Sequence, residues 1–70
     1  MSSIVKVIEL ISEGESIDAA IKSAVTEASK TIQEIKQVNV EHIEARVEKN
    51  KVTKFRVNVK VSFVVDHEQN

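Results

Sequence analysis

The stretch that most constrains the fold is KQVNVEHIEARV, residues 36–47, because its apolar alternation changes parity partway along. Val38 and Val40 take even positions, whereas Ile43, Ala45 and Val47 take odd ones. A β-strand places successive side chains on opposite faces, so a regular strand here would bury one face and then the other. The alternative is a bulge near residues 41–42, which would restore a single apolar face and bend the strand.

The segments before this stretch predict a strand followed by a helix. IVKVIELI, residues 4–11, is rich in β-branched residues and predicts a strand with apolar side chains on both faces, and SEGE, residues 12–15, predicts a break. Ser16 stands where a helix N-cap is expected, and Asp18 favours the positive end of the helix. The apolar residues that follow repeat with helical spacing, which predicts an amphipathic helix over residues 17–31.

The segments after the helix predict a long β-hairpin. We expect strands over residues 34–48 and 51–65, joined by a tight turn at Lys49–Asn50, because Asn tolerates the left-handed conformation of two-residue turns. The predicted fold is α+β, a β-α-β-β chain in which a three-stranded antiparallel sheet wraps around one helix. Its 70 residues make a single domain, residues 1–70, with residues 66–70 expected to form a frayed tail.

A turn at residues 49–50 also predicts the register of the hairpin. In a regular ladder, Val38 and Val40 lie opposite Val61 and Val59, on the face that covers the helix. Beyond the parity change, the same register puts residues 43, 45 and 47 on the opposite face, with these pairs: Ile43 with Arg56, Ala45 with Lys54 and Val47 with Val52. A monomer has nothing to cover that second stripe. We therefore favour a subunit interface formed by Ile43, Ala45, Val47 and Val52 over a simple bulge.

Composition narrows the function classes. The net charge is −1 with charges of both signs interspersed, and the chain has two Phe and no Trp or Tyr, which argues against a nucleic-acid binder. There is no cysteine, so oligomerisation is the expected source of extra stability in so small a domain. No apolar run reaches the ~18 residues of a membrane span, and the first ten residues do not read as a signal peptide, so we expect no membrane partner and a cytoplasmic location.

The order and spacing of four motifs resemble the dodecin family. These motifs are VKVIEL, SIDAAIKSAVTEASKTI, IKQVNVEHIEARVE and FRVNVKVSF, and they span nearly the whole chain. Dodecins are small β-α-β-β proteins that assemble as hollow homododecamers of tetrahedral symmetry built from trimers. The resemblance therefore implies self-association and a non-enzymatic role in binding a small ligand. No catalytic residue is predicted, because no triad or paired carboxylates occur at suitable spacing.

The resemblance also places a candidate ligand pocket. Flavin-binding dodecins carry a tryptophan, which stacks on the flavin ring, at the position of Gln37, and a glutamine at the position of Arg56. Both are replaced here, and Gln37 offers no aromatic face, which argues against flavin as a ligand. Gln37 with Arg56 resembles a tryptophan-less branch of the family, for which calcium binding is an expectation. No cofactor is required by this interpretation.

Several interpretations of the polar residues remain open. Glu41 lies diagonal to Arg56 and Lys60 in the regular register, which predicts a ladder of salt bridges or, alternatively, a pocket in which Arg56 and Lys60 receive an anionic group. We favour Glu41 as the partner of Arg56, and we expect His42 to be a neutral, hydrogen-bonded residue at a bend or interface. The candidates for calcium ligation are Glu44, Glu48 and Asp66. The leading functional hypothesis is a homododecameric shell that binds, stores or buffers a small ligand or ion. The alternatives are a purely structural or partner-binding assembly with an empty pocket, and weak residual flavin binding.

Overall fold

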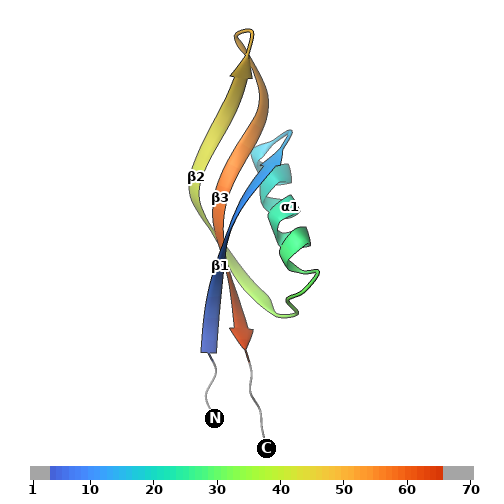
Figure 1. Cartoon of the computed structure of the whole chain (residues 1–70), viewed down its shortest axis with the longest axis vertical. Coiled ribbons are helices and arrows are strands. Elements are labelled where there is room, and N and C mark those ends of the chain that lie inside the picture. The colour runs from blue at the N-terminus through green and yellow to red at the C-terminus, as the bar shows by residue number, and fades with distance from the viewer. Residues whose placement is uncertain (1–3, 66–70) are drawn as a thin grey trace, which may run out of the picture.

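The computed structural model describes residues 4–65, which form a β-α-β-β unit. Strand β1 spans Ile4–Gly14, helix α1 spans Ile17–Ala28, and strands β2 (Ile35–Glu48) and β3 (Lys51–Val65) form a long hairpin. The three strands make one antiparallel sheet in the order β1-β3-β2, and α1 packs on one face of it (Figure 1). The predicted fold is confirmed. The expected tail at residues 66–70 lies outside the described residues.

Helix α1 begins where the sequence predicts and ends three residues earlier. The Ser16 hydroxyl accepts a hydrogen bond from the Ala19 backbone N–H at 3.0 Å, as expected for an N-cap. After Ala28 the backbone bonds of Lys30 and Thr31 reach back only three residues, so the last turn tightens and the α-helix stops. None of the helices within residues 4–65 is long and apolar enough to cross a bilayer.

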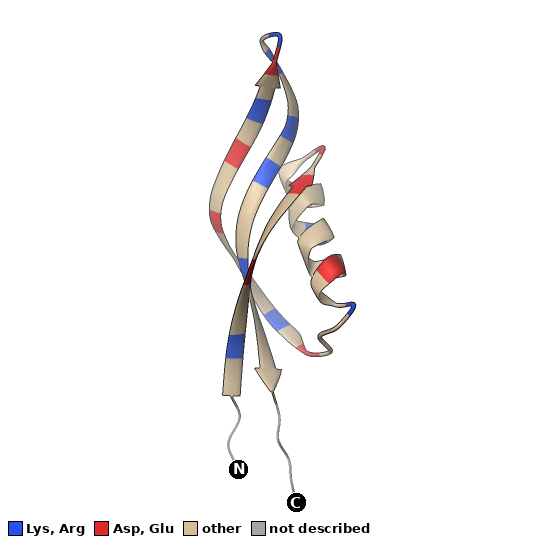
Figure 2. Ribbon diagram, in the orientation of Figure 1, with Lys and Arg blue, Asp and Glu red and all other residues tan. Residues whose placement is uncertain are grey.

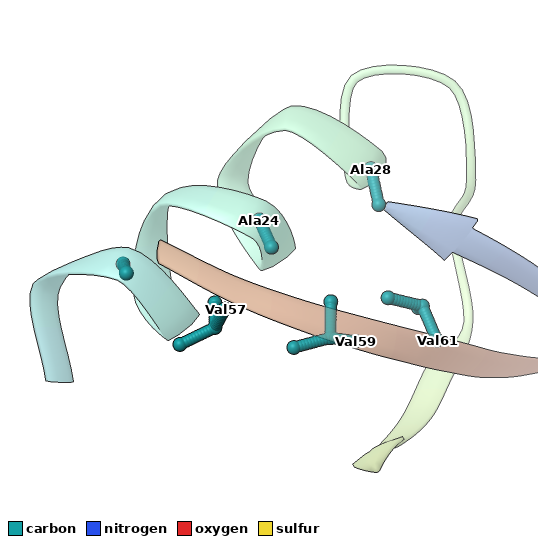
Figure 3. Close-up of a cluster of buried hydrophobic side chains, with 6 residues drawn as sticks. Ala24, Ala28, Val57, Val59 and Val61 are labelled. Atoms are coloured by element: carbon teal, nitrogen blue, oxygen red, sulfur yellow. The ribbon is translucent and has the colours of Figure 1, made fainter. Parts of the chain in front are cut away.

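The core consists entirely of small apolar side chains. Ala20, Ala24 and Ala28 line one side of α1 and pack against a row of three valines on β3, Val57, Val59 and Val61 (Figure 3). All six are buried, whereas Ile8, Leu10, Ile21 and other apolar residues around them are partly buried. Because alanine adds only one carbon beyond the backbone, the helix axis approaches the central strand closely.

Gly14 is required by the same close packing at the end of β1. A methyl group added at Gly14 would lie 2.6 Å from the Ala20 backbone nitrogen and 3.0 Å from the Ala19 carbonyl carbon. Both are helix backbone atoms that cannot rotate away. β1 also runs to Gly14 instead of ending at residue 11 as predicted, so residues 12–14 pair with β3.

The parity change in β2 is a bulge, and our preference for a continuous stripe on the outer face is wrong. Val38 and Val40 lie opposite Val61 and Val59 as predicted, but the register shifts between Val40 and His42, which leaves Glu41 as the extra residue. Beyond it the pairs are Ile43 with Val57 and Ala45 with Phe55, instead of Arg56 and Lys54. A one-residue shift returns these side chains to the face that carries α1.

The end of the hairpin nevertheless extends past the helix. A second register shift, between Arg46 and Val47, brings Val47 opposite Val52 as predicted, and the turn has Lys49 and Asn50 at φ 52° and 63°. β1 ends opposite Phe55, so only two strands continue beyond it (Figure 1). We call residues 43–55 the overhang, of which residues 46–54 extend past β1, whereas residues 43–45 and 55 lie level with its last three residues. Its apolar residues Ile43, Val47 and Val52 are 52–58% exposed, because no part of α1 covers them.

Replacing Gly14 with alanine should destabilise the chain substantially. The added methyl group must displace helix backbone, and overpacking of this kind costs roughly 1–3 kcal/mol. Urea unfolding followed by circular dichroism measures the effect, with Glu15→Ala as the control at the exposed neighbouring position. A Gly14→Ala variant as stable as the wild type would show that α1 can move away from β1.

Candidate ligand-binding face

The sheet surface opposite α1, here called the outer face, carries most of the polar residues singled out from the sequence. Gln37 lies opposite Ser62 and Asn39 opposite Lys60, both as predicted. The bulge changes the next pairs, so His42, and not Glu41, lies opposite Asn58, and Glu44 lies opposite Arg56. The structure thus brings His42 and Glu44 towards Arg56 and moves Glu41 away from it.

Gln37, Asn39 and Glu41 form a chain of hydrogen bonds along β2. The Gln37 side-chain amide donates to Asn39 Oδ1 at 3.1 Å, and the Asn39 amide donates to Glu41 Oε2 at 3.3 Å. All three residues are exposed. Glu41 is therefore engaged by an amide on its own strand and makes no salt bridge to Arg56 or Lys60 among the described residues.

The carboxylate that binds Arg56 belongs to Glu13 on β1, which corrects our expectation of Glu41. Arg56 donates to Glu13 Oε2 from Nε at 3.1 Å and from Nη2 at 2.8 Å, and Lys54 Nζ donates to Glu13 Oε1 at 3.1 Å. The sequence predicted a break at residues 12–15, so it could not place Glu13 in a strand. In the structure, Glu13 lies directly opposite Arg56 across the β1–β3 ladder.

This cluster lowers the pKa of Glu13 below its usual value of about 4.5. The largest cause is the hydrogen bond from Arg56, followed by the bond from Lys54, since both favour the ionised carboxylate. The side chains remain between about one third and one half exposed to solvent, so water and salt screen the attraction. The cluster mainly fixes the end of β1 against β3.

A small cavity on the outer face lies beside the cluster. Its volume is about 170 Å³, and it is lined by Ile11, His42, Glu44, Arg56 and Asn58. The Asn58 Oδ1 atom is buried and has no hydrogen-bond partner, although a buried carbonyl normally has one. A ligand group that carries an N–H or O–H donor would satisfy it, while Glu44 offers a second acceptor and Arg56 a cation.

The four predicted pocket residues do not converge within one chain. Only Arg56 lines the cavity, whereas Gln37 lies opposite Ser62, six residues along β3 from Arg56 and therefore about 20 Å away. Lys60 lies between them, opposite Asn39. A site that contains both Gln37 and Arg56 needs residues from more than one copy of the chain.

The candidate calcium ligands do not form a site in this chain either. Glu44 lines the outer cavity, Glu48 lies opposite Lys51 near the hairpin turn, and Asp66 lies outside the described residues. Within residues 4–65, no three His, Cys, Asp or Glu side chains gather closely enough to hold a metal ion.

Sequence reasoning missed three residues of this face, namely Ile11, Glu13 and Asn58. Ile11 and Glu13 share the parity of the outer face of β1, but the predicted end of the strand excluded Glu13. Asn58 stands at a polar position of the alternating strand β3, and alternation alone does not indicate that its side-chain carbonyl is buried. One signal for Glu13 was available in the sequence. If the alternation of β1 is continued into the SEGE segment, Glu13 falls on the same face as Ile11.

The Glu13 cluster should make stability depend on pH. The ion pairs contribute fully above about pH 4.5, and their contribution is lost as the pH falls through the lower pKa of folded Glu13. Glu13→Gln should therefore lower the melting temperature at pH 7 and reduce its dependence on pH below 4.5. Glu41→Gln is the matched control, since a glutamine there can still accept from Asn39. Larger losses in Glu41→Gln than in Glu13→Gln would contradict the assignment.

Known structures share this fold over nearly the whole chain. A variant of the dodecin from Thermus thermophilus is 26% identical, and the alignment covers 93% of this chain and 98% of that one with a TM-score of 0.86. The dodecin from Streptomyces coelicolor is 25% identical, with coverage of 91% and 93% and a TM-score of 0.85. The dodecin from Streptomyces davaonensis, at 21% identity, covers 94% and 98% with a TM-score of 0.86 and supports the fold alone.

Sequence comparison agrees with the structural one at the level of the family. No match was found among curated proteins. The sequence profile of the dodecin family matches residues 4–66, which include every residue that the structure describes. The match spans the strand, the helix and both strands of the hairpin, so the chain belongs to the dodecin family.

Proposed function

We propose that this chain assembles as a homododecamer, a cytosolic and non-enzymatic shell that binds, stores or buffers a small ligand or ion. Dodecins are generally non-enzymatic proteins that form homododecamers and bind small ligands. The proposal applies that role to this chain. It is supported by the apolar surface that the single chain leaves uncovered.

The amount of exposed apolar surface carries the proposal. Among residues 4–65, only six are buried, all alanine or valine, whereas nine large apolar side chains are exposed. These are Ile4, Val5, Val7, Ile11, Ile17, Val40, Ile43, Val47 and Val52. A solitary domain of this size gains little from so small a core, and contiguous exposed apolar surface is typical of subunit interfaces. The predicted interface residues Ile43, Val47 and Val52 belong to this surface, and Ala45 lies between them on β2.

The outer face supports ligand binding in the assembly. Its cavity holds an unsatisfied acceptor, Asn58 Oδ1, beside Arg56 and His42, and Gln37 can join it only from another copy. We propose that the ligand binds between subunits and is not held by aromatic stacking, since Gln37 occupies the position of the stacking tryptophan. On this basis we group the chain with the tryptophan-less dodecins. Calcium ligation by Glu44 or Glu48 at a symmetry axis is a further part of the proposal.

A purely structural assembly is the second candidate function. It is favoured by one observation: Arg56 is already paired with the carboxylate of Glu13 within the chain. An anionic ligand would have to compete with that carboxylate. In this alternative the shell forms, its pockets stay empty, and it serves as a scaffold for a partner.

The assembly prediction is tested by the mass of the particle in solution. Native mass spectrometry and light scattering at micromolar concentration should show twelve chains of 7.8 kDa. Ile43→Glu should disrupt the particle before it unfolds α1, because it places a charge on an apolar surface that the assembly buries. Lys22→Glu, on the exposed side of the helix, is the control. A stable wild-type monomer, or an intact dodecamer in Ile43→Glu, would contradict the proposal.

The flavin prediction is tested by fluorescence titration. Riboflavin should bind weakly and the protein should purify colourless, because a stacked aromatic pair contributes roughly 0.5–1.5 kcal/mol beyond burial and Gln37 cannot form one. Gln37→Trp combined with Arg56→Gln should increase quenching of riboflavin fluorescence. Gln37→Leu with Arg56→Gln is the control, since it adds apolar area without a ring. Tight binding by the wild type would show that stacking is not the dominant contribution.

A further inference from the structure

The small cavity of the outer face contains more electron-pair donors than the chain itself satisfies. The buried Asn58 Oδ1 atom has no hydrogen-bond partner, and leaving a buried carbonyl oxygen unpaired is unfavourable. Among the described residues, the Glu44 carboxylate and the His42 ring also make no salt bridge and no side-chain hydrogen bond. All three side chains line the same cavity of about 170 Å³. A group that enters the cavity therefore meets three free donors of electron pairs.

The bulge at Glu41 brings these three side chains to one face. The register shift places His42 directly opposite Asn58, and side chains opposite each other in a ladder have Cβ atoms about 5 Å apart. Glu44 lies two residues further along β2, on the same face and diagonal to Asn58. A regular ladder through Glu41 would instead have turned His42 and Glu44 to the face that carries α1. The arrangement therefore depends on the bulge.

An imidazole, a carboxylate and an amide carbonyl together suit a divalent transition metal ion. Imidazole nitrogen is a preferred ligand of zinc and its neighbours in the first row, and these ions also accept carboxylate and carbonyl oxygens. The cavity volume corresponds to roughly five water molecules at about 30 Å³ each, so an ion held by three side chains can keep water in its remaining positions. Clusters of three His, Cys, Asp or Glu are absent from residues 4–65, but this set differs because its third ligand is an amide.

The cation that lines the cavity is engaged on its other side. Arg56 donates from Nε and Nη2 to Glu13 on β1, which lies across β3 from Glu44, and Lys54 binds the same Glu13 carboxylate. These four charges sum to zero, so the nearest groups decide which ligand fits. Glu44 keeps no cation of its own, although acidic and basic residues follow each other along this part of the hairpin (Figure 2). An anion would meet the Glu44 carboxylate and the Asn58 carbonyl, whereas a positive ion is bound by both.

We propose that His42, Glu44 and Asn58 of one chain bind a divalent transition metal ion of the zinc type, with water completing its coordination. This inference rests on the proposed function only in naming an ion that the shell binds, since all three ligands belong to a single chain. It differs from calcium binding at a symmetry axis, because calcium takes oxygen ligands and an axis shares one ion among several chains. Axial calcium ligation then falls to Glu48, and each chain holds one zinc-type ion of its own.

Isothermal titration calorimetry of the full chain, freed of metal by a chelator, tests the site. Zinc chloride should bind at one ion per chain, manganese(II) should bind more weakly, and calcium should not compete. His42→Gln and Glu44→Gln should each weaken zinc binding about tenfold or more. The matched controls are His67→Gln, which replaces the other histidine of the chain, and Glu48→Gln, which replaces another carboxylate of β2. Both controls should bind zinc as the wild type does.

Substitutions at Asn58 and Arg56 test the details of the arrangement. Asn58→Leu should lose zinc affinity about tenfold and yet melt no lower than the metal-free wild type, because it removes an unpaired buried carbonyl. Asn58→Asp should bind zinc more tightly, since it adds a negative charge to the ligand set. Arg56→Gln should bind zinc no more weakly than the wild type, because it removes a cation from the cavity wall. Circular dichroism checks that each variant is folded, and loss of zinc binding in folded Arg56→Gln would contradict the arrangement.

The outcomes separate this inference from the proposed function. Zinc binding weaker than about 1 mM, binding that persists in His42→Gln, calcium that binds more tightly than zinc, or fewer than one zinc per chain would each overturn the inference. Native mass spectrometry of the same samples reports the particle mass. A dodecamer without zinc would overturn the metal site and leave the proposed assembly standing. A monomer that binds one zinc ion through these residues would support the metal site and contradict the proposed assembly.

Discussion

The structure depends on the contact between three alanines of α1 and three valines of β3. Because these six side chains are small, the helix lies close to the central strand, and that closeness determines much of the rest. It requires glycine at position 14, and it leaves the larger apolar residues around the core only partly buried or exposed. A domain that packs its helix with so little apolar volume leaves most of its large apolar side chains available for contacts with other molecules.

The fold followed from the sequence because its signals are local. Helical spacing, the Ser16 cap, the alternation of β3 and the Lys49–Asn50 turn each depend on neighbouring residues, and all were confirmed. The register beyond Glu41 was not predictable in the same way. One parity change is compatible with a bulge or with two apolar faces, and the choice depends on whether Ile43 pairs with Val57 or Arg56 across the hairpin.

The candidate site was harder to predict than the fold for a related reason. Arg56 was recognised as a residue in need of a partner, but the partner is 43 positions earlier in the chain, on a strand whose end was placed too early. The distance between Gln37 and Arg56 shows a second limit of prediction from sequence. Residues that function together can lie on different copies of the chain. A sequence reports neither the register of distant strands nor the symmetry that relates chains.

The bulge at Glu41 makes the length of β2 as important as its composition. The apolar residues of β2 take even positions before Glu41 and odd positions after it. Because Glu41 is an extra residue in the ladder, Val38, Val40, Ile43 and Ala45 still lie on a common face. Because Val40 and His42 pair with the neighbouring residues Val59 and Asn58, deletion of Glu41 would leave a regular ladder with the same pairs and the same two faces. Deletion of Glu44 would instead exchange the faces of the residues beyond it and turn Arg46 towards the apolar side. β2 is therefore expected to tolerate the loss of one residue at its bulge, but not the loss of one residue a few positions further on.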